Sequence, residues 1–175
     1  GKHLPLDAAP IRFASWMGGD RDGNPNVTAA VTEEVLAVAR WEAADLFLKD
    51  IHELREDLSL SECNQAMRER VGDHPEPYRE LLRDVRQRLR NTREWAEAGV
   101  RGDSFSLMDK PIYLHDREIL EPLQLIYQSL VECGMEAIAD GSLVDILRRV
   151  ACFGLTLLKL DIRQEAARHA EVVAE

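Results

Sequence analysis

Two short stretches of the sequence gather side chains of the kind that bind ligands. The first, SWMGGDRDGNPNVT at 15–28, combines three glycines with two aspartates, an arginine and two asparagines. The second, LTLLKLDIR at 155–163, ends in Arg163. A guanidinium donates two parallel hydrogen bonds to a phosphate or a carboxylate, so Arg163 is a candidate for anion recognition. A structural ion pair with Asp161 or Glu165 is the alternative.

The glycine-rich stretch allows positive φ angles and a close approach of backbone to a ligand. Its pattern is neither a dinucleotide-binding fingerprint nor a P-loop, because no GK[ST] follows. A tight turn held by aspartate hydrogen bonds is the alternative interpretation. The candidate residues for the rim of a binding site are Trp16, Gly18, Gly19, Asp20, Arg21, Asp22, Gly23 and Asn24.

The same stretch does not fit a metal site. A calcium loop counted from Asp20 would need glycine at its sixth position and glutamate at its twelfth, and those positions hold Pro25 and Val31. We therefore predict no metal ligand in this chain. Arg21 lies between two aspartates, which favours an ion pair over a catalytic role.

The elements that position these residues follow from hydrophobic periodicity. IRFASW at 11–16 predicts a brief buried strand, and the alternation in 155–163 predicts a second one. Thr28 or Thr32 is expected to cap a helix running to about Asp57, with Glu33 and Glu34 in its first turn. That helix either changes neighbours along its length or breaks. Further helices are predicted over 62–71, about 78–99, 116–133 and 140–154, with a loop over 100–115.

Two strands separated by a long helical excursion are typical of neighbouring strands in a helix-wrapped parallel sheet or barrel. Chemistry in barrels gathers at the carboxyl ends of the strands. We therefore expect residues 18–26 and 163–165 to share one rim. The predicted fold class is mostly α-helical with two short parallel strands, a fragment of a helix-enlarged (β/α)8 barrel over residues 1–175.

Composition narrows the function classes. The net charge of −10 argues against a general nucleic-acid binder. No apolar run is long enough to span a membrane, and no signal peptide is visible in residues 1–15. The three cysteines form no CxxC pair, which fits a reducing cytoplasm without a disulfide framework or zinc site. The chain starts with Gly1 and stops within a helical pattern, so we expect a piece of a longer protein.

The residues SWMGGDRDGNPNVT, WEAADLFLKDI, ECGM and LRRVACFGLTLLKLDIRQEAARH resemble bacterial phosphoenolpyruvate carboxylase. The resemblance covers essentially the whole chain, although residues 59–115 contribute little to it. It implies a cytoplasmic, allosterically controlled homotetramer built on an enlarged (β/α)8 barrel and using Mg²⁺ or Mn²⁺. It also implies that Arg163 holds the substrate phosphate and that residues 18–25 border the active site, preceded by Trp16.

The family enzymes convert phosphoenolpyruvate and bicarbonate to oxaloacetate and phosphate. The resemblance implies attack of bicarbonate on the phosphate, followed by carboxylation of the pyruvate enolate by carbon dioxide. The family's catalytic histidine segment, its FHGRGG-type loop and its metal-binding carboxylates are absent from these 175 residues, so the chain alone is expected to be inactive. It is also expected to self-associate through apolar surface that normally faces missing strands.

Two rival interpretations come from other classes of protein. One is a free-standing acidic helical interaction module, which the amphipathic helices fit. The other is a regulatory domain that binds a phosphorylated ligand without chemistry, and it would show saturable binding of phosphoenolpyruvate. The interaction module does not explain the long polar loop or the polar strand face of Lys159, Asp161 and Arg163. Saturable binding by the 175 residues is not expected, because they hold only one of several phosphate ligands.

Overall fold

A computed structural model describes residues 4–6, 8–102 and 110–174. The elements are β1 (Ala14–Ser15), α1 (Ala29–Asp57), α2 (Gln65–Val71), α3 (Pro77–Val100), α4 (Arg117–Glu132), α5 (Glu136–Ile138), α6 (Val144–Phe153), β2 (Lys159–Leu160) and α7 (Ala166–Ala174). A π-helical turn at Ala139–Leu143 joins α5 to α6, and a 3₁₀ turn at Gly154–Thr156 follows α6. The predicted mostly helical architecture with two short parallel strands is confirmed.

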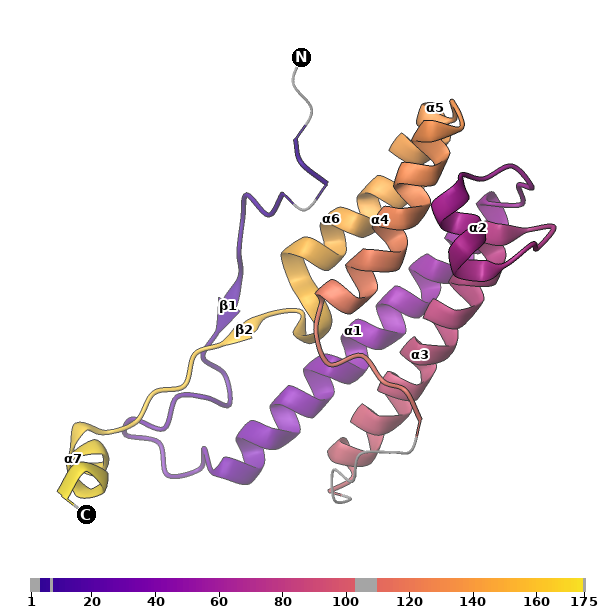
Figure 1. Ribbon diagram of the computed structural model, residues 1–175. Helices are drawn as coiled ribbons and strands as arrows, with labels where there is room; N and C mark the ends of the chain where they lie inside the picture. The colour runs from indigo at the N-terminus through magenta and orange to yellow at the C-terminus, as the bar shows by residue number, and fades with distance from the viewer. Residues whose placement is uncertain (1–3, 7, 103–109, 175) are drawn as a thin grey trace.

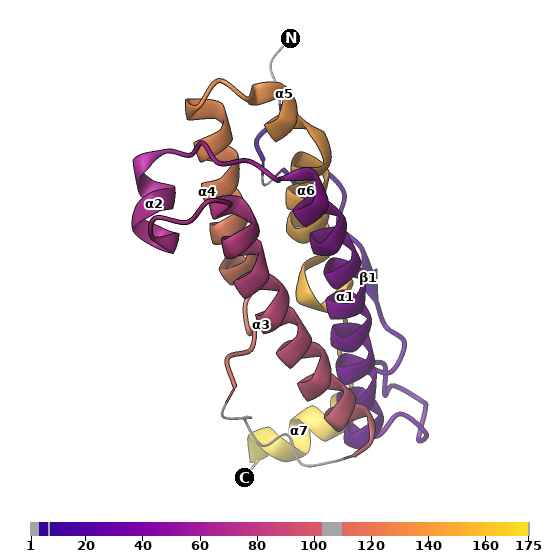
Figure 2. The same ribbon diagram turned by 90° about the vertical axis from the view of Figure 1, so that its right-hand side faces the viewer.

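The helices form a bundle in which α1 packs along α3 and α4 packs along α6, while α2 rests on α3 and α4 (Figure 1). The core is continuous across these helices and includes Ile51, Leu82, Leu123 and Leu147, none of which is exposed. The strand pair and α7 lie to one side of the bundle, as Figures 1 and 2 show. No helix of the described residues is long and apolar enough to cross a membrane.

Helix α1 begins where the sequence predicts, because the Thr28 side chain accepts a hydrogen bond from the Val31 N–H over 3.3 Å. Glu33 and Glu34 fall after the first turn, which contains no acidic residue, so that expectation was wrong. The helix is unbroken to Asp57 and changes neighbours. Its first turns approach the glycine-rich loop at Val35, while its later turns bury Ile51 in the core.

The two strands pair in parallel as predicted, with Ala14 opposite Lys159 and Ser15 opposite Leu160. Both are much shorter than predicted. Leu157 takes φ +58°, which interrupts the extended backbone expected from residue 155. The first strand is also not buried, since Ile11, Phe13 and Trp16 are more than half exposed. Among the described residues the sheet has only these two strands. So small a sheet cannot bury the apolar side chains on its faces by itself.

The remaining helical predictions are confirmed with small shifts of their ends. Residues 110–116 are non-helical, as predicted for the loop over 100–115, and residues 103–109 of that loop lie outside the described part of the chain. Buried Tyr78 on α3 shares a hydrogen bond of 2.9 Å with Ser129 on α4, which joins these helices inside the core. Burial raises the pKa of Tyr78 to about 12, so the phenol is neutral near pH 7.

Candidate functional site

The glycine-rich loop is a tight turn whose backbone cannot carry side chains at two positions. The Trp16 carbonyl accepts hydrogen bonds from the N–H groups of Gly19 and Asp20, over 3.1 and 3.0 Å. Gly18 has φ +81°, and a Cβ there would lie 2.6 Å from Val35 Cγ2. A Cβ on Gly19 would lie 2.2 Å from the Asp161 carbonyl oxygen. The loop is therefore pressed between α1 on one side and the end of β2 on the other.

Aspartate and asparagine side chains support the rest of the loop. Asp20 Oδ1 accepts from the Asp22 N–H over 3.2 Å, and Asn24 Oδ1 accepts from the Asn26 N–H over 3.1 Å. These are turns in which a short polar side chain bonds the backbone two residues on. The loop is therefore a turn held by side-chain hydrogen bonds, as the alternative interpretation predicted. Such a turn can still border a bound ligand.

Arg163 is joined directly to this loop through its backbone. The Arg163 N–H donates to the Gly19 carbonyl over 3.0 Å, and the Arg21 N–H donates to the Arg163 carbonyl over 3.0 Å. Asp20 and Arg163 thereby form a parallel bridge beyond the ends of β1 and β2. The structure therefore brings the predicted rim residues and Arg163 to one edge, while their roles in binding stay predictions.

The side chain of Arg163 is available for a ligand. Its Nη2 lies 3.4 Å from Asp161 Oδ2, and its side chain is 59% exposed. An exposed pair of this length contributes little to stability, so it is easily exchanged for a stronger anionic partner. Of the two predicted ion-pair partners of Arg163, the structure shows Asp161 and not Glu165.

Arg21 makes a different contact from the predicted one. Its Nη2 donates to Thr32 Oγ1 over 3.0 Å, and among the described residues it forms no ion pair. The predicted pairing with Asp20 or Asp22 was wrong, because the guanidinium reaches Thr32 on α1 instead. The Nε atom of Arg21 is buried without a hydrogen-bond partner in the described part of the chain. The Thr32 hydroxyl in turn donates to the Gly18 carbonyl over 2.7 Å.

Trp16 supports the loop through its backbone carbonyl. Its side chain is 61% exposed, so the indole does not pack into the loop. Gly23 has φ +66° and nothing within 4 Å of an added Cβ, which places it at an open tip of the loop. His169 on α7 is exposed.

No metal site emerges from the described residues, which contain no group of three or more His, Cys, Asp or Glu side chains placed to hold an ion. Cys63, Cys133 and Cys152 are all free thiols. The donor set of the described residues therefore does not fit a metal cofactor.

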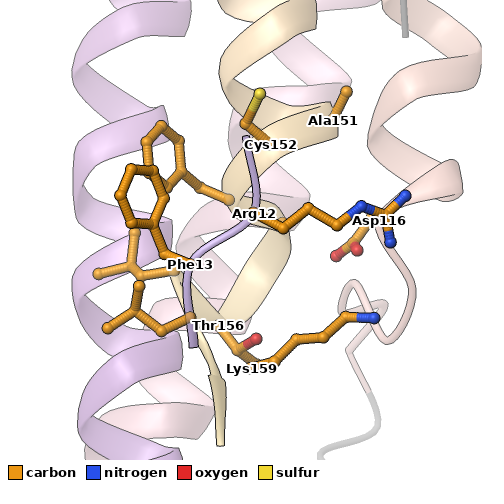
Figure 3. Close-up of a pocket in the computed structure, with 11 residues that line it drawn as sticks. Arg12, Phe13, Asp116, Ala151, Cys152, Thr156 and Lys159 are labelled. Carbon is orange, nitrogen blue, oxygen red and sulfur yellow. The ribbon is translucent and has the colours of Figure 1, made fainter. Parts of the chain in front are cut away.

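Sequence reasoning missed a second polar feature beside the strands. A cavity of about 260 Å³ is lined by Arg12 and Lys159 from the strand segments and by Asp116, which precedes α4. Figure 3 shows the long side chains of Arg12 and Lys159 extending to the side where Asp116 lies. From the sequence, Asp116 was only the first residue of a predicted helix. No local sequence pattern connects it with residues near 155.

Comparisons with known proteins identify the class to which this loop and strand pair belong. The sequence model of the family "Phosphoenolpyruvate carboxylase" matches residues 1–175, so the chain belongs to the phosphoenolpyruvate carboxylase family. It is 57% identical over 175 residues to the phosphoenolpyruvate carboxylase of Aeromonas hydrophila, covering 100% of this chain and 20% of that protein. Enzymes of the same name from Pseudomonas putida and Pseudomonas fluorescens are 57% and 58% identical, with the same coverage.

The chain therefore spans about a fifth of the length of these relatives. The family resemblance drawn from the motifs is confirmed, as is the expectation that the 175 residues are part of something longer.

Proposed function

We propose that the longer protein containing this chain is a phosphoenolpyruvate carboxylase, and that the chain supplies one edge of its active site. The observation that carries this proposal is the match of the family model to residues 1–175, combined with an exposed Arg163 tied to the glycine-rich loop. The enzyme would convert phosphoenolpyruvate and bicarbonate to oxaloacetate and phosphate, an anaplerotic carbon fixation.

Arg163 would hold the phosphate of phosphoenolpyruvate. Its guanidinium is exposed at the carboxyl end of β2, and its backbone is fixed by two 3.0 Å hydrogen bonds to the loop. A fixed backbone with an accessible planar donor group suits a phosphoryl ligand, since the donors need little reorganisation when charge develops. Trp16 and the loop residues from Gly18 to Asn24 would border the substrate.

The reaction proposed has two steps. An oxygen of bicarbonate forms a bond to phosphorus while the bond from phosphorus to the enol oxygen breaks, which gives carboxyphosphate and the pyruvate enolate. Carboxyphosphate then releases carbon dioxide and phosphate, and the enolate carbon forms the new bond to carbon dioxide. Arg163 would stabilise the negative charge on the transferring phosphoryl group.

The rest of the machinery would lie outside these residues. We infer a helix-enlarged (β/α)8 barrel in which β1 and β2 are adjacent strands, and in which the chain is a segment rather than an independent domain. Mg²⁺ or Mn²⁺ would be held by side chains elsewhere in the protein. A cytoplasmic homotetramer under allosteric control is the expected assembly.

The test is bicarbonate-dependent oxaloacetate formation by the full-length protein. Wild type should be active with Mg²⁺ supplied, and the Arg163→Ala variant should lose about 10²-fold or more in kcat/KM for phosphoenolpyruvate. Arg163→Lys should recover only part of this loss, because an ammonium lacks the planar fork. Arg101→Ala, which removes an exposed arginine at the end of α3, is the matched control and should be unaffected.

Each outcome separates the candidates. Near-normal kinetics of Arg163→Ala would overturn the phosphate role. An intact, folded and metal-supplied wild type without activity would overturn the enzymatic proposal and favour an interaction module or a phospholigand-binding domain. The isolated 175 residues should be inactive.

A further inference from the structure

Asp116 occupies the position before the first turn of α4 but does not cap it with its side chain. Its carbonyl oxygen accepts from the N–H groups of Ile119 and Leu120, each over 3.1 Å, while its carboxylate makes no capping bond. An aspartate at this position ordinarily accepts an N–H from its own helix. The carboxylate instead reaches across to the turn after α6, where Oδ1 accepts the Leu155 N–H over 2.8 Å.

The turn after α6 leaves room for the Asp116 carboxylate only because residue 154 is glycine. Gly154 ends α6 with φ +58°, and a Cβ there would lie 2.6 and 2.7 Å from the two carboxylate oxygens. Leu155 is only 1% exposed, so its N–H has no access to bulk water. An unpaired buried N–H is costly, and Asp116 is the group that satisfies this one.

This turn determines where β2 begins. The 3₁₀ turn at Gly154–Thr156 leads through Leu157, with φ +58°, into Lys159 and Leu160. Three residues beyond β2 stands Arg163, whose backbone is bonded to the glycine-rich loop. A displacement of Leu155 would therefore be passed through Leu157 and the short strand β2 to Arg163.

The segment that carries Asp116 is itself firmly attached to the bundle. Arg40 Nη1 on α1 donates to the Tyr113 carbonyl over 3.1 Å, and Thr92 Oγ1 on α3 accepts the Tyr113 N–H over 2.8 Å. Arg88 Nε on α3 donates to the Ile112 carbonyl over 2.9 Å. Asp116 thus follows a segment, residues 112–113, that hydrogen bonds fix to α1 and α3. Its carboxylate can therefore couple the position of these helices to that of β2.

We propose that Asp116 is a positioning residue that sets the entry of β2 and thereby the place of the Arg163 guanidinium in the active site. The inference rests on the proposed function, in which Arg163 holds the phosphate of phosphoenolpyruvate. Asp116 acts through hydrogen bonding to Leu155 rather than through contact with the substrate.

The experiment uses full-length enzyme with three variants at or near this position. Asp116→Ser places a residue that is favourable before a helix at this position, but its side chain is too short to reach the Leu155 N–H. Asp116→Asn keeps a carboxamide oxygen that accepts the Leu155 N–H. Glu121→Ala, which removes an exposed carboxylate from the same helix, is the control. Asp116→Ser should raise the KM for phosphoenolpyruvate about tenfold or more, because a small misplacement of a binding group is costly.

The KM for bicarbonate should change little, and Asp116→Asn and Glu121→Ala should both stay near wild type. A second measurement combines Asp116→Ser with Arg163→Ala. If Asp116 acts through Arg163, the double variant should have the kinetics of Arg163→Ala alone.

Normal kinetics of Asp116→Ser, or full additivity in the double variant, would overturn the inference. Equal effects of Asp116→Ser and Asp116→Asn would also overturn it, since the hydrogen bond to Leu155 would then not be the cause. Failure of the wild-type enzyme to form oxaloacetate would instead count against the proposed function, so the two failures are distinguishable.

Discussion

Asp20 and Arg163 lie opposite each other in a parallel bridge at the point where two sequence-distant segments meet. The bridge follows β1 and β2 along the chain but is shifted by two residues from their register, and hydrogen bonds on both sides of it join the loop to the segment after β2. The loop and Arg163 are therefore one structural unit, and changes that separate them should affect both the stability of this edge and the use of substrate.

Gly19 should not tolerate a side chain. Gly19→Ala places a Cβ 2.2 Å from the Asp161 carbonyl oxygen, a backbone atom that can move only if the bridge opens. We expect a loss of about 1–3 kcal/mol in the free energy of unfolding, measured by urea denaturation. Gly141→Ala is the control, since nothing lies within 4 Å of a Cβ there. Equal stability of the two variants would contradict the tight junction between loop and strand.

The Thr32 hydroxyl should be needed to hold the loop against α1. Thr32→Val preserves the side chain's shape but removes the donor to the Gly18 carbonyl, at 2.7 Å, and the acceptor for Arg21 Nη2, at 3.0 Å. The expected cost is about 1–3 kcal/mol, because buried polar groups lose their partners. In the full-length enzyme the KM for phosphoenolpyruvate should also rise. Thr156→Val, at a hydroxyl with no hydrogen bond among the described residues, should leave the free energy of unfolding unchanged.

Glu118 should make the protein sensitive to acid. Burial raises the pKa of this carboxyl, but the N–H groups of His115 and Leu114 and the guanidinium of Arg88 outweigh burial and lower the pKa to about 2. A depressed folded-state pKa contributes stability above about pH 4.5 that is lost as the pH falls through about 2.

Glu118→Gln should lack this pH-dependent part of the free energy of unfolding, which is about 1–3 kcal/mol. The measurement is denaturation of both proteins at a series of pH values between about 5 and about 2. Glu121→Gln, on the same helix and 60% exposed, should keep the wild-type acid profile. An unchanged profile in Glu118→Gln would show that the ionised Glu118 carboxylate does not stabilise the fold.

Helices α3 and α4 were predictable from sequence because each carries its own apolar stripe. On α3, Tyr78, Leu81, Leu82, Val85 and Leu89 recur at helical spacing and are all buried. The strands were predicted too long because alternation alone does not report the left-handed backbone of Leu157. The proximity of the loop to Arg163 was predicted because the carboxyl ends of neighbouring parallel strands lie at the same edge.

The partners of individual side chains did not follow from sequence. The contact of Asp116 with Leu155 spans 39 residues, and an aspartate before a helix looks the same whether or not it caps its own N–H groups. The contact of Arg21 with Thr32 was likewise hidden by nearer aspartates that suggested an ion pair. Long-range hydrogen bonds of this kind depend on packing, which periodicity does not encode.

The isolated chain should self-associate through the strand pair. Ile11, Phe13, Trp16, Met17 and Ile162 are between 51% and 71% exposed around two strands whose outer edges have no strand beside them in the described residues. Exposed apolar surface beside unpaired strand edges favours pairing between copies. Sedimentation velocity at increasing concentration should therefore show oligomers. Ile162→Lys should shift the distribution towards monomer, because a charge would have to be buried at the contact.

Leu36→Lys makes the same charge change at a 39% exposed site on α1 and should leave association unchanged. A chain that stays monomeric at every concentration would contradict the prediction. Equal dissociation by both lysine variants would show that association follows net charge rather than the strand pair. In the full-length protein we expect this surface to be covered by the remaining strands, so Ile162→Lys should there reduce folding yield instead of dissociating a complex.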